Sequence, residues 1–225
     1  MLVSVVMPCF NAGCYIAEAI QSILGQTYKD FELIIVNDAS TDQSQLIIDH
    51  YVKSDKRVKC LTNTQNMGIS YSRNRGVKEA KGQYVAVMDS DDIASPERLK
   101  RSLAALKKAD MVYSAYLQSD PDGHLTGLVE PEPPSKLNMA QILKTQMVPH
   151  VTMMGKRELF QYKDDYHTND DLYIVSKMFH DGVKFRKIRE PLMIVRYHNS
   201  STSQTKLKDI KRVASEVKKE FGSGI

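Results

Sequence analysis

Three aspartates stand within four residues, at positions 89, 91 and 92, directly after an apolar run at 84–88. Carboxylates so close together repel one another unless a cation or hydrogen-bond donors neutralise them. Mg²⁺ and Mn²⁺ prefer carboxylate oxygens and commonly bridge them to substrate phosphates. The segment Asp89-Ser90-Asp91-Asp92 therefore predicts a divalent metal site for a phosphate-bearing ligand. The structural alternative is a loop of solvated acids that caps the helix beginning near Pro96.

Short β-branched apolar runs, which alternate with amphipathic helical patterns, must position these acids. Such alternation is typical of an α/β protein with a parallel, doubly wound sheet. The predicted strands are 2–7, 31–36, 84–88 and 111–116, and the predicted helices are 14–24, 42–53, 70–80 and 96–107. Later patterns predict a hairpin at 119–123, helices at 139–144 and 172–181, and a strand at 192–196.

Polar residues follow the predicted strands at the points where the strands end. The first strand runs into Pro8-Cys9-Phe10-Asn11 and the second into Asn37-Asp38-Ala39-Ser40, while Arg73 lies on the third helix. Ligands of such sheets bind at the carboxyl ends of the strands, so we expect these residues and the Asp89–Asp92 acids to converge on one edge. Asp38 taken alone is better explained as a helix cap.

Four segments in order, VSVVMPCFN, FELIIVNDAST, NMGISYSRNRG and GQYVAVMDSDD, resemble the family-2 glycosyltransferases over nearly all of residues 1–115. The resemblance implies the GT-A fold: a Rossmann-like, mostly parallel central sheet flanked by helices, with a smaller acceptor-side region. It also implies that Asp38 holds the nucleotide base, Asp89 faces the ribose and Asp91 binds the metal. The full set of predicted donor-binding residues is Pro8, Phe10, Asn11, Asp38, Arg73, Asp89 and Ser90.

The second half of the chain resembles the family more loosely. The pair Asp170-Asp171 stands where the family shows Glu-Asp at the start of a helix, and two registers are open. We prefer Asp171 as the catalytic base; Asp170 would then replace the usual glutamate, which keeps it as the alternative. An acidic pair favoured by the helix dipole is the structural explanation. His198 resembles a family histidine that binds the metal or the diphosphate, although a structural histidine fits equally well.

Together with these residues, the resemblance implies an inverting, metal-dependent glycosyltransferase of polysaccharide biosynthesis. The predicted donor is a nucleotide sugar, with a UDP-sugar favoured because the family uses it most. The predicted acceptor is a hydroxyl of a saccharide or lipid-linked molecule, and the predicted cofactor is Mn²⁺ or Mg²⁺. One alternative is a non-catalytic nucleotide-sugar binding module. The other is a sugar-nucleotide nucleotidyltransferase, which needs a glycine-rich, basic phosphate loop that residues 8–13 do not provide.

Composition limits the partners and the cellular compartment that we expect for the protein. The 31 basic and 27 acidic residues leave a charge of +4, which does not call for a nucleic-acid partner. Three cysteines without a CxxC spacing favour a reducing compartment over a disulfide or zinc framework. The apolar run at 2–7 is too short for a signal peptide, and no run approaches the roughly 20 apolar residues of a membrane span. We therefore expect a cytoplasmic protein.

Three regions are predicted along the chain. Residues 1–117 form a nucleotide-sugar-binding half, and 118–205 form an acceptor-binding and catalytic-base half of the same domain. Residues 206–225 form a C-terminal amphipathic helix whose other face is basic. That helix either docks on the domain or attaches the protein peripherally to the anionic inner face of a membrane.

Overall fold

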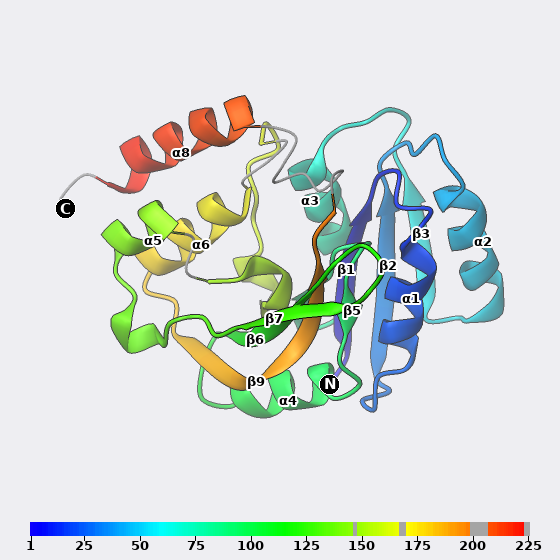
Figure 1. Ribbon diagram of the computed structural model, residues 1–225, viewed down its shortest axis with the longest axis horizontal. Helices are drawn as coiled ribbons and strands as arrows, with labels where there is room; N and C mark the ends of the chain where they lie inside the picture. The colour runs from blue at the N-terminus through cyan, green and yellow to red at the C-terminus, as the bar shows by residue number, and fades with distance from the viewer. Residues whose placement is uncertain (146–147, 167–169, 199–206, 223–225) are drawn as a thin grey trace.

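A central sheet organises the computed structural model, which describes residues 1–145, 148–166, 170–198 and 207–222 (Figure 1). Within these residues the sheet has nine strands in the order β3-β2-β1-β4-β8-β6-β9-β5, and β7 pairs with β6. The strands are β1 (Val3–Cys9), β2 (Phe31–Asn37), β3 (Val58–Thr62), β4 (Tyr84–Val87), β5 (Ile93–Ala94), β6 (Met111–Ser119), β7 (Leu125–Val129), β8 (Met154–Lys156) and β9 (Phe185–Arg196).

The first four strands are all parallel, as the alternating sequence pattern predicts. β1 lies between β2 and β4, and β3 pairs with the far side of β2. Three helices connect these strands: α1 (Ile16–Leu24), α2 (Ser44–Ser54) and α3 (Ile69–Glu79). The register aligns Cys9 of β1 with Asn37 of β2. The loops that follow the two strands therefore leave the sheet at the same level, on the edge where we expect the site.

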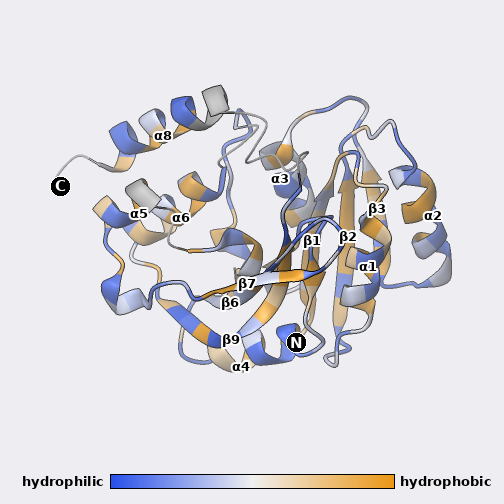
Figure 2. Ribbon diagram, viewed as in Figure 1, coloured by the Kyte–Doolittle hydropathy of each residue, from blue (hydrophilic) through white to orange (hydrophobic). Residues whose placement is uncertain are grey.

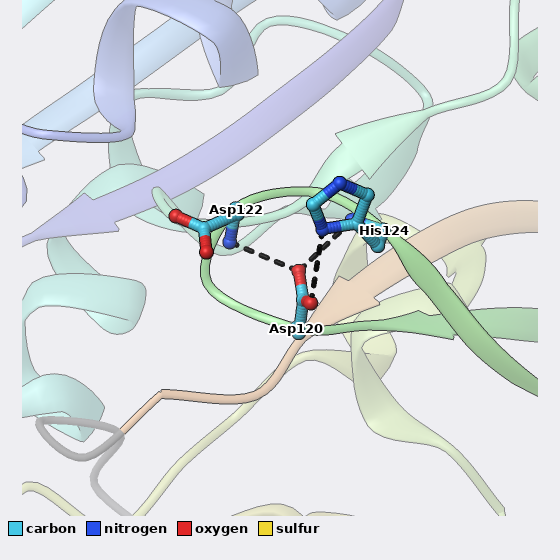
Figure 3. A group of neighbouring side chains, drawn as sticks. All are labelled: Asp120, Asp122 and His124. Carbon is cyan, nitrogen blue, oxygen red and sulfur yellow. Dashed lines mark hydrogen bonds and ion pairs between the residues drawn. The ribbon is translucent and has the colours of Figure 1, made fainter.

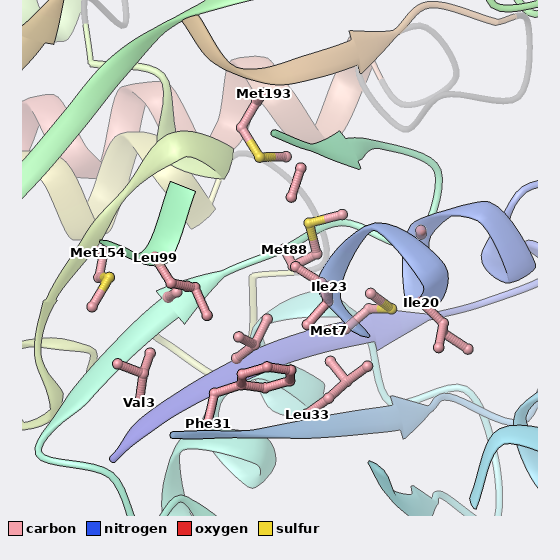
Figure 4. Close-up of a cluster of buried hydrophobic side chains, with 14 of the residues drawn as sticks. Val3, Met7, Ile20, Ile23, Phe31, Leu33, Met88, Leu99, Met154 and Met193 are labelled. Atoms are coloured by element: carbon pink, nitrogen blue, oxygen red, sulfur yellow. The ribbon is translucent and has the colours of Figure 1, made fainter. Parts of the chain in front are cut away.

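Alternation of side chains along β1 and β2 divides the interior into two cores. Every residue of both strands is buried, which requires helices on both faces of the sheet. Val3, Val5 and Met7 pack with α1, α2 and α4 (Arg98–Leu106), and Figure 4 shows part of this core. Val6 points to the opposite core, which contains α3 and the later helices. Glycine lets α3 approach β1, because a Cβ on Gly76 would lie 2.5 Å from Val6 Cγ1.

The later helices gather on one side of the molecule, away from α2 (Figure 1). They are α5 (Met139–Thr145), α6 (Asp170–His180) and α8 (Leu207–Phe221), with short 3₁₀ turns at Pro134–Lys136, His150–Thr152 and Arg157–Leu159. Val213 and Val217 of α8 are fully buried in the core that α6 also lines. The C-terminal helix therefore docks on the domain, as the structural alternative expects. Residues 206 and 223–225 of the predicted helix lie outside the described residues.

The outer face of α8 remains polar, as the blue segments in Figure 2 show, and Lys211, Lys218 and Lys219 are exposed. Peripheral attachment to a membrane through this face stays a prediction. Among the described residues, no helix combines the length and the apolar character that crossing a bilayer demands.

The predicted strands lack β3, β5 and β8, and β9 is much longer than predicted. β3 has the sequence VKCLT, in which only Val58 is buried, so it shows no clear strand pattern. β5 has two residues and β8 has three, too few to show a periodic pattern. β9 begins at Phe185 rather than residue 192. Its first seven residues include four charged residues and Pro191, and Ile188 alone among the seven is buried, so the sequence shows no strand pattern there. β8 runs antiparallel to both β4 and β6 and joins them, so strands from both halves of the chain share one sheet. The division at residue 117 stays a prediction.

Candidate active site

The acidic loop after β4 lies at the carboxyl end of the parallel strands, partly buried. The side chains of Asp89 and Asp91 are 31% and 27% exposed, whereas Asp92 is buried. Asp92 turns inward, where its Oδ1 accepts a hydrogen bond of 2.9 Å from the backbone N–H of Arg196. Burial, and then the neighbouring carboxylates, raise the pKa of Asp91 and of Asp92. The loop therefore carries more negative charge than its protein neighbours neutralise.

His198 reaches this loop from the end of β9. Its Nε2 lies 2.9 Å from Asp91 Oδ2, and its side chain is 9% exposed. The two residues predicted to bind metal are thus brought together although 107 positions separate them. Ser90, between the two acids of the motif, is also buried.

Arg73 connects the acidic loop to the start of α6. Its Nη2 lies 2.8 Å from Asp89 Oδ1 and its Nη1 lies 2.6 Å from Asp170 Oδ2. Burial lowers the pKa of Arg73, but the charges of Asp170 and Asp89 outweigh burial and hold that pKa above its usual value. The guanidinium is 5% exposed and lies over the ring of Tyr162. The structure thus gives Arg73 two carboxylate partners in place of open access to a ligand.

Asp171, the preferred catalytic base, follows Asp170 on α6 and has a different environment. Its Oδ1 accepts a hydrogen bond of 2.8 Å from the N–H of Leu172. Desolvation and then the charge of Asp170 raise the pKa of Asp171 to about 6. The residue lies at a shallow, tightly packed recess that Ile142, Val148, Leu172 and Val175 also line.

Asp38, the predicted base-binding residue, bonds to the loop that leads into α3. Its carboxylate accepts hydrogen bonds from Asn63 Nδ2 (2.6 Å) and from the backbone N–H groups of Met67 and Gly68 (2.8 Å each). Gly68 has a φ of +92°, a conformation that a glycine adopts without strain. Asp38 therefore orders the entry to α3 without bonding to an N–H group of its first turn, so it is not the helix cap that the structural alternative expects.

The loops after β1 and β2 are bonded to each other. Asn11 Oδ1 accepts the N–H of Thr41 at 2.8 Å, and the N–H of Asn11 donates to Ser40 Oγ at 3.0 Å. Phe10 is 49% exposed beside this junction, while Pro8 lies inside β1. The two loops thus converge as predicted, and both Phe10 and Asn11 are exposed there.

Sequence reasoning missed the contacts that Tyr15 and Glu18 of the α1 segment make near this site. The Tyr15 ring contacts His198, and Glu18 pairs with Arg196. The rule that ligands bind at the carboxyl ends of strands could have drawn attention to Tyr15, which stands at the start of the first helix.

A second Asp-x-Asp segment lies in the turn between β6 and β7 (Figure 3). The ligand atoms of Asp120, Asp122 and His124 lie within 4.8 Å of one another, and the latter two residues are exposed. Asp120 Oδ1 accepts the N–H groups of Asp122 and His124, and its Oδ2 lies 3.1 Å from His124 Nδ1. These contacts account for the group as a hydrogen-bonded turn.

Comparison with known proteins places this geometry in a family. Residues 4–162 match the family model described as Glycosyl transferase family 2. The uncharacterized glycosyltransferase MJ1057 of Methanocaldococcus jannaschii is 32% identical over 219 residues, which cover 92% of this chain and 74% of that protein. The chain spans 63% of the length of an uncharacterized glycosyltransferase of Haemophilus influenzae, at 33% identity. It spans 40% of the length of the glycosyltransferase GlyG of Streptococcus pneumoniae, at 38% identity.

Solved structures show the same fold. S. aureus TarS 1-349 in complex with UDP-GlcNAc has a TM-score of 0.78 at 20% identity, covering 96% of this chain and 66% of that one. The mannosyltransferase PcManGT from Pyrobaculum calidifontis, in complex with GDP-Man and Mn²⁺, has a TM-score of 0.67 at 18% identity, covering 90% and 58%. These likenesses confirm the predicted GT-A fold.

Proposed function

Since the chain belongs to glycosyl transferase family 2, we propose that it moves a sugar from a nucleotide-sugar donor to a hydroxyl of a saccharide or lipid-linked acceptor. One observation carries the proposal. Arg73 joins the acidic loop at Asp89 to the start of α6 at Asp170, so a candidate metal site and a candidate base meet at the carboxyl edge of the sheet.

The donor that we propose is a UDP-sugar. The three hydrogen bonds to Asp38 leave one Oδ2 lone pair of the carboxylate for the imide N–H of uracil. The half-exposed ring of Phe10 offers a face on which the base can stack. TarS has been solved with UDP-GlcNAc, which supports this choice, although PcManGT has been solved with GDP-Man.

Asp91 and His198 are the residues that we propose to hold Mn²⁺ or Mg²⁺. Carboxylate and imidazole atoms form a donor set that suits Mn²⁺. Burial, and then the charge of Asp89, raise the pKa of Asp91, and a bound cation would favour the ionised carboxylate. When bound, the ion supplies Lewis-acid stabilisation of the departing nucleoside diphosphate. Asp89 then faces the ribose, while Asp92 stays with the Arg196 backbone as a structural acid.

Asp171 is the catalytic base in this proposal, and Asp170 holds Arg73. A carboxyl whose pKa is about 6 stays largely ionised near neutral pH and accepts a proton more readily than an ordinary aspartate. Asp171 takes the proton of the acceptor hydroxyl as the oxygen attacks the anomeric carbon. Attack from the face opposite the leaving nucleotide inverts the anomeric configuration.

Asp171→Asn tests the proposal, because asparagine keeps the shape and the bond from Leu172 but is not a base. We expect the variant to retain thermal stabilisation by UDP and Mn²⁺, since binding to the native state raises Tm by mass action. Transfer, measured as UDP release from a panel of UDP-sugars with saccharide and lipid-linked acceptors, should fall about 10²- to 10⁴-fold.

Asp170→Asn is the matched comparison at the neighbouring position. If it abolishes transfer while Asp171→Asn does not, the base is Asp170. Donor binding without turnover by the wild type, with every acceptor offered, would favour the non-catalytic binding module. Failure of all nucleotides and nucleotide sugars to stabilise the wild type would contradict the proposal.

A further inference from the structure

Tyr15, the residue that precedes α1, contacts two side chains from the end of β9. The Arg196 guanidinium lies over the Tyr15 ring, 4.7 Å from its centroid. The His198 ring lies 4.8 Å from the same centroid, tilted by 34°. The function proposed above uses His198 but assigns nothing to Tyr15 or to the Arg196 side chain.

Hydrogen bonds hold both the backbone of Tyr15 and the Arg196 side chain that lies over its ring. Its backbone N–H donates to the carbonyl of Ala12 at 2.9 Å, which anchors the residue to the loop after β1. The Arg196 side chain is 6% exposed, and its Nη2 lies 2.6 Å from Glu18 Oε2. The backbone N–H of Arg196 also donates to Asp92. Arg196 is therefore held at its backbone and at its guanidinium, and a cation held over an aromatic face attracts the ring.

The Tyr15 ring, held in this way, packs against His198 and limits the orientation of its imidazole. Its Nε2 lies 2.9 Å from Asp91 Oδ2, while its ring rests against Tyr15. The direction of a ligating imidazole is set by the groups packed around it, and replacing such groups commonly weakens metal binding by about 10- to 100-fold. His198 lies two residues beyond the end of β9, where the Tyr197 N–H still donates to the Ser119 carbonyl of β6, so contacts of the ring add to the backbone in directing the imidazole.

We propose that Tyr15 is a positioning residue for His198, its ring held by Arg196 so that the imidazole presents Nε2 to Asp91. The placement of the ring stands on the geometry alone. Its consequence for metal binding rests on the function proposed above.

Proton–carbon NMR of histidine rings in the metal-free protein tests the placement directly. Replacing Tyr15 with leucine removes the ring that attracts Arg196 and contacts His198. We expect Tyr15→Leu to move the His198 resonances and Tyr15→Phe to leave them close to wild type. Tyr15→Met, which substitutes a flexible side chain, should repeat the leucine result if the leucine variant does not fold.

Mn²⁺ titration followed by electron paramagnetic resonance, with UDP present, measures the consequence. We expect Tyr15→Leu to weaken Mn²⁺ binding about tenfold and Tyr15→Phe to restore it. In a His198→Gln background, Tyr15→Leu should cause no further loss, because Tyr15 acts through that histidine. Tyr51→Leu is a matched control: Tyr51 contacts His50 with ring centroids 5.4 Å apart, away from the acidic loop. It should move only the His50 resonances.

Wild-type His198 resonances in a folded Tyr15→Leu variant would overturn the inference. So would a loss of Mn²⁺ affinity that persists in the His198→Gln background. A different result separates this inference from the proposed function: if His198→Gln leaves Mn²⁺ binding unchanged while Tyr15→Leu still moves the His198 resonances, the positioning stands and the metal role of His198 fails.

Discussion

The chain contains two Asp-x-Asp segments, each with a histidine beside it, and the fold treats them in opposite ways. Asp89-Ser90-Asp91 follows a buried parallel strand and meets His198 from 107 residues away. Asp120-Pro121-Asp122 lies in a hairpin turn and meets His124, four residues from Asp120. The two segments match the same Asp-x-Asp sequence pattern.

Their electrostatic environments explain the difference. Burial and neighbouring carboxylates raise the pKa of Asp91, so the first segment has more charge than its partners balance. The backbone N–H of His124, together with other local contacts, lowers the pKa of Asp120, because these donors stabilise the carboxylate. An Asp-x-Asp segment indicates ligand chemistry when the fold buries it and brings partners from distant elements. When its own turn satisfies it, the same segment is only a turn.

Arg73→Met removes the buried ion pairs that link the first segment to α6, and we expect the largest effect from this substitution. Arg73 and Asp170 are 5% and 4% exposed, so removing the arginine leaves a buried carboxylate unpaired. Such a loss costs about 3–5 kcal/mol. Urea denaturation should show it, and Arg73→Met/Asp170→Asn should recover part of the stability. The control is Lys177→Met on α6, whose partly exposed ion pair with Asp181 contributes about 0.2–0.5 kcal/mol. Equal losses in the two single variants would show that the buried link has no special weight.

Asp91→Asn and Asp122→Asn make the same substitution at the same position of the two segments. We expect the first to weaken Mn²⁺ binding in the presence of UDP at least about 100-fold, since it removes a proposed ligand, and the second to leave it unchanged. Isothermal titration or Mn²⁺ resonance measures both. The opposite outcome would move the metal site to the exposed hairpin.

Sequence patterns predicted the position of the first segment, because the strand before it belongs to a regular alternation of strands and helices. The runs that become β1, β2 and β4 are buried on both faces, and so they are nearly continuous apolar stretches, with Ser4 and Glu32 as internal polar residues. Once the sheet is parallel, the convergence of Asn11, Asp38 and Asp89 on one edge follows from topology alone. No such rule separates the second segment from a binding loop, apart from the turn chemistry of its proline and glycine.

Contacts between the two halves of the chain could not be read from the sequence. The pairing of Arg73 with Asp170 spans 97 positions and depends on where α6 sits beside the sheet. The strand β8 links β4 to β6, but its three residues are too few to show a strand pattern in the sequence. The contacts of Tyr15 with Arg196 and His198 likewise exist only because β9 ends beside the start of α1.

The pH dependence of transfer sharpens the contrast between raised and lowered carboxyl pKa values. Asp171 acts as a base only when ionised, so protonation below its pKa of about 6 removes activity. We expect kcat/KM to fall about tenfold per pH unit below that value and to level off above it. Asp122→Asn should leave this profile unchanged. An acidic limb near pH 4, the ordinary range of an aspartate, would show that Asp171 is not the group that titrates.

Asp120→Ala should have the smallest effect, confined to the hairpin. It removes the acceptor of the Asp122 and His124 N–H groups but leaves the backbone bonds between Asp120 and His124 and between Gly123 and Asp120. Hydrogen exchange at His124 should quicken, while Tm and Mn²⁺-dependent UDP binding should stay at wild-type values. Asp120→Asn, which keeps Oδ1 as an acceptor, should exchange as the wild type does. If Asp120→Ala instead weakened UDP binding, the hairpin would belong to the site, and the contrast between the two segments would lose its basis.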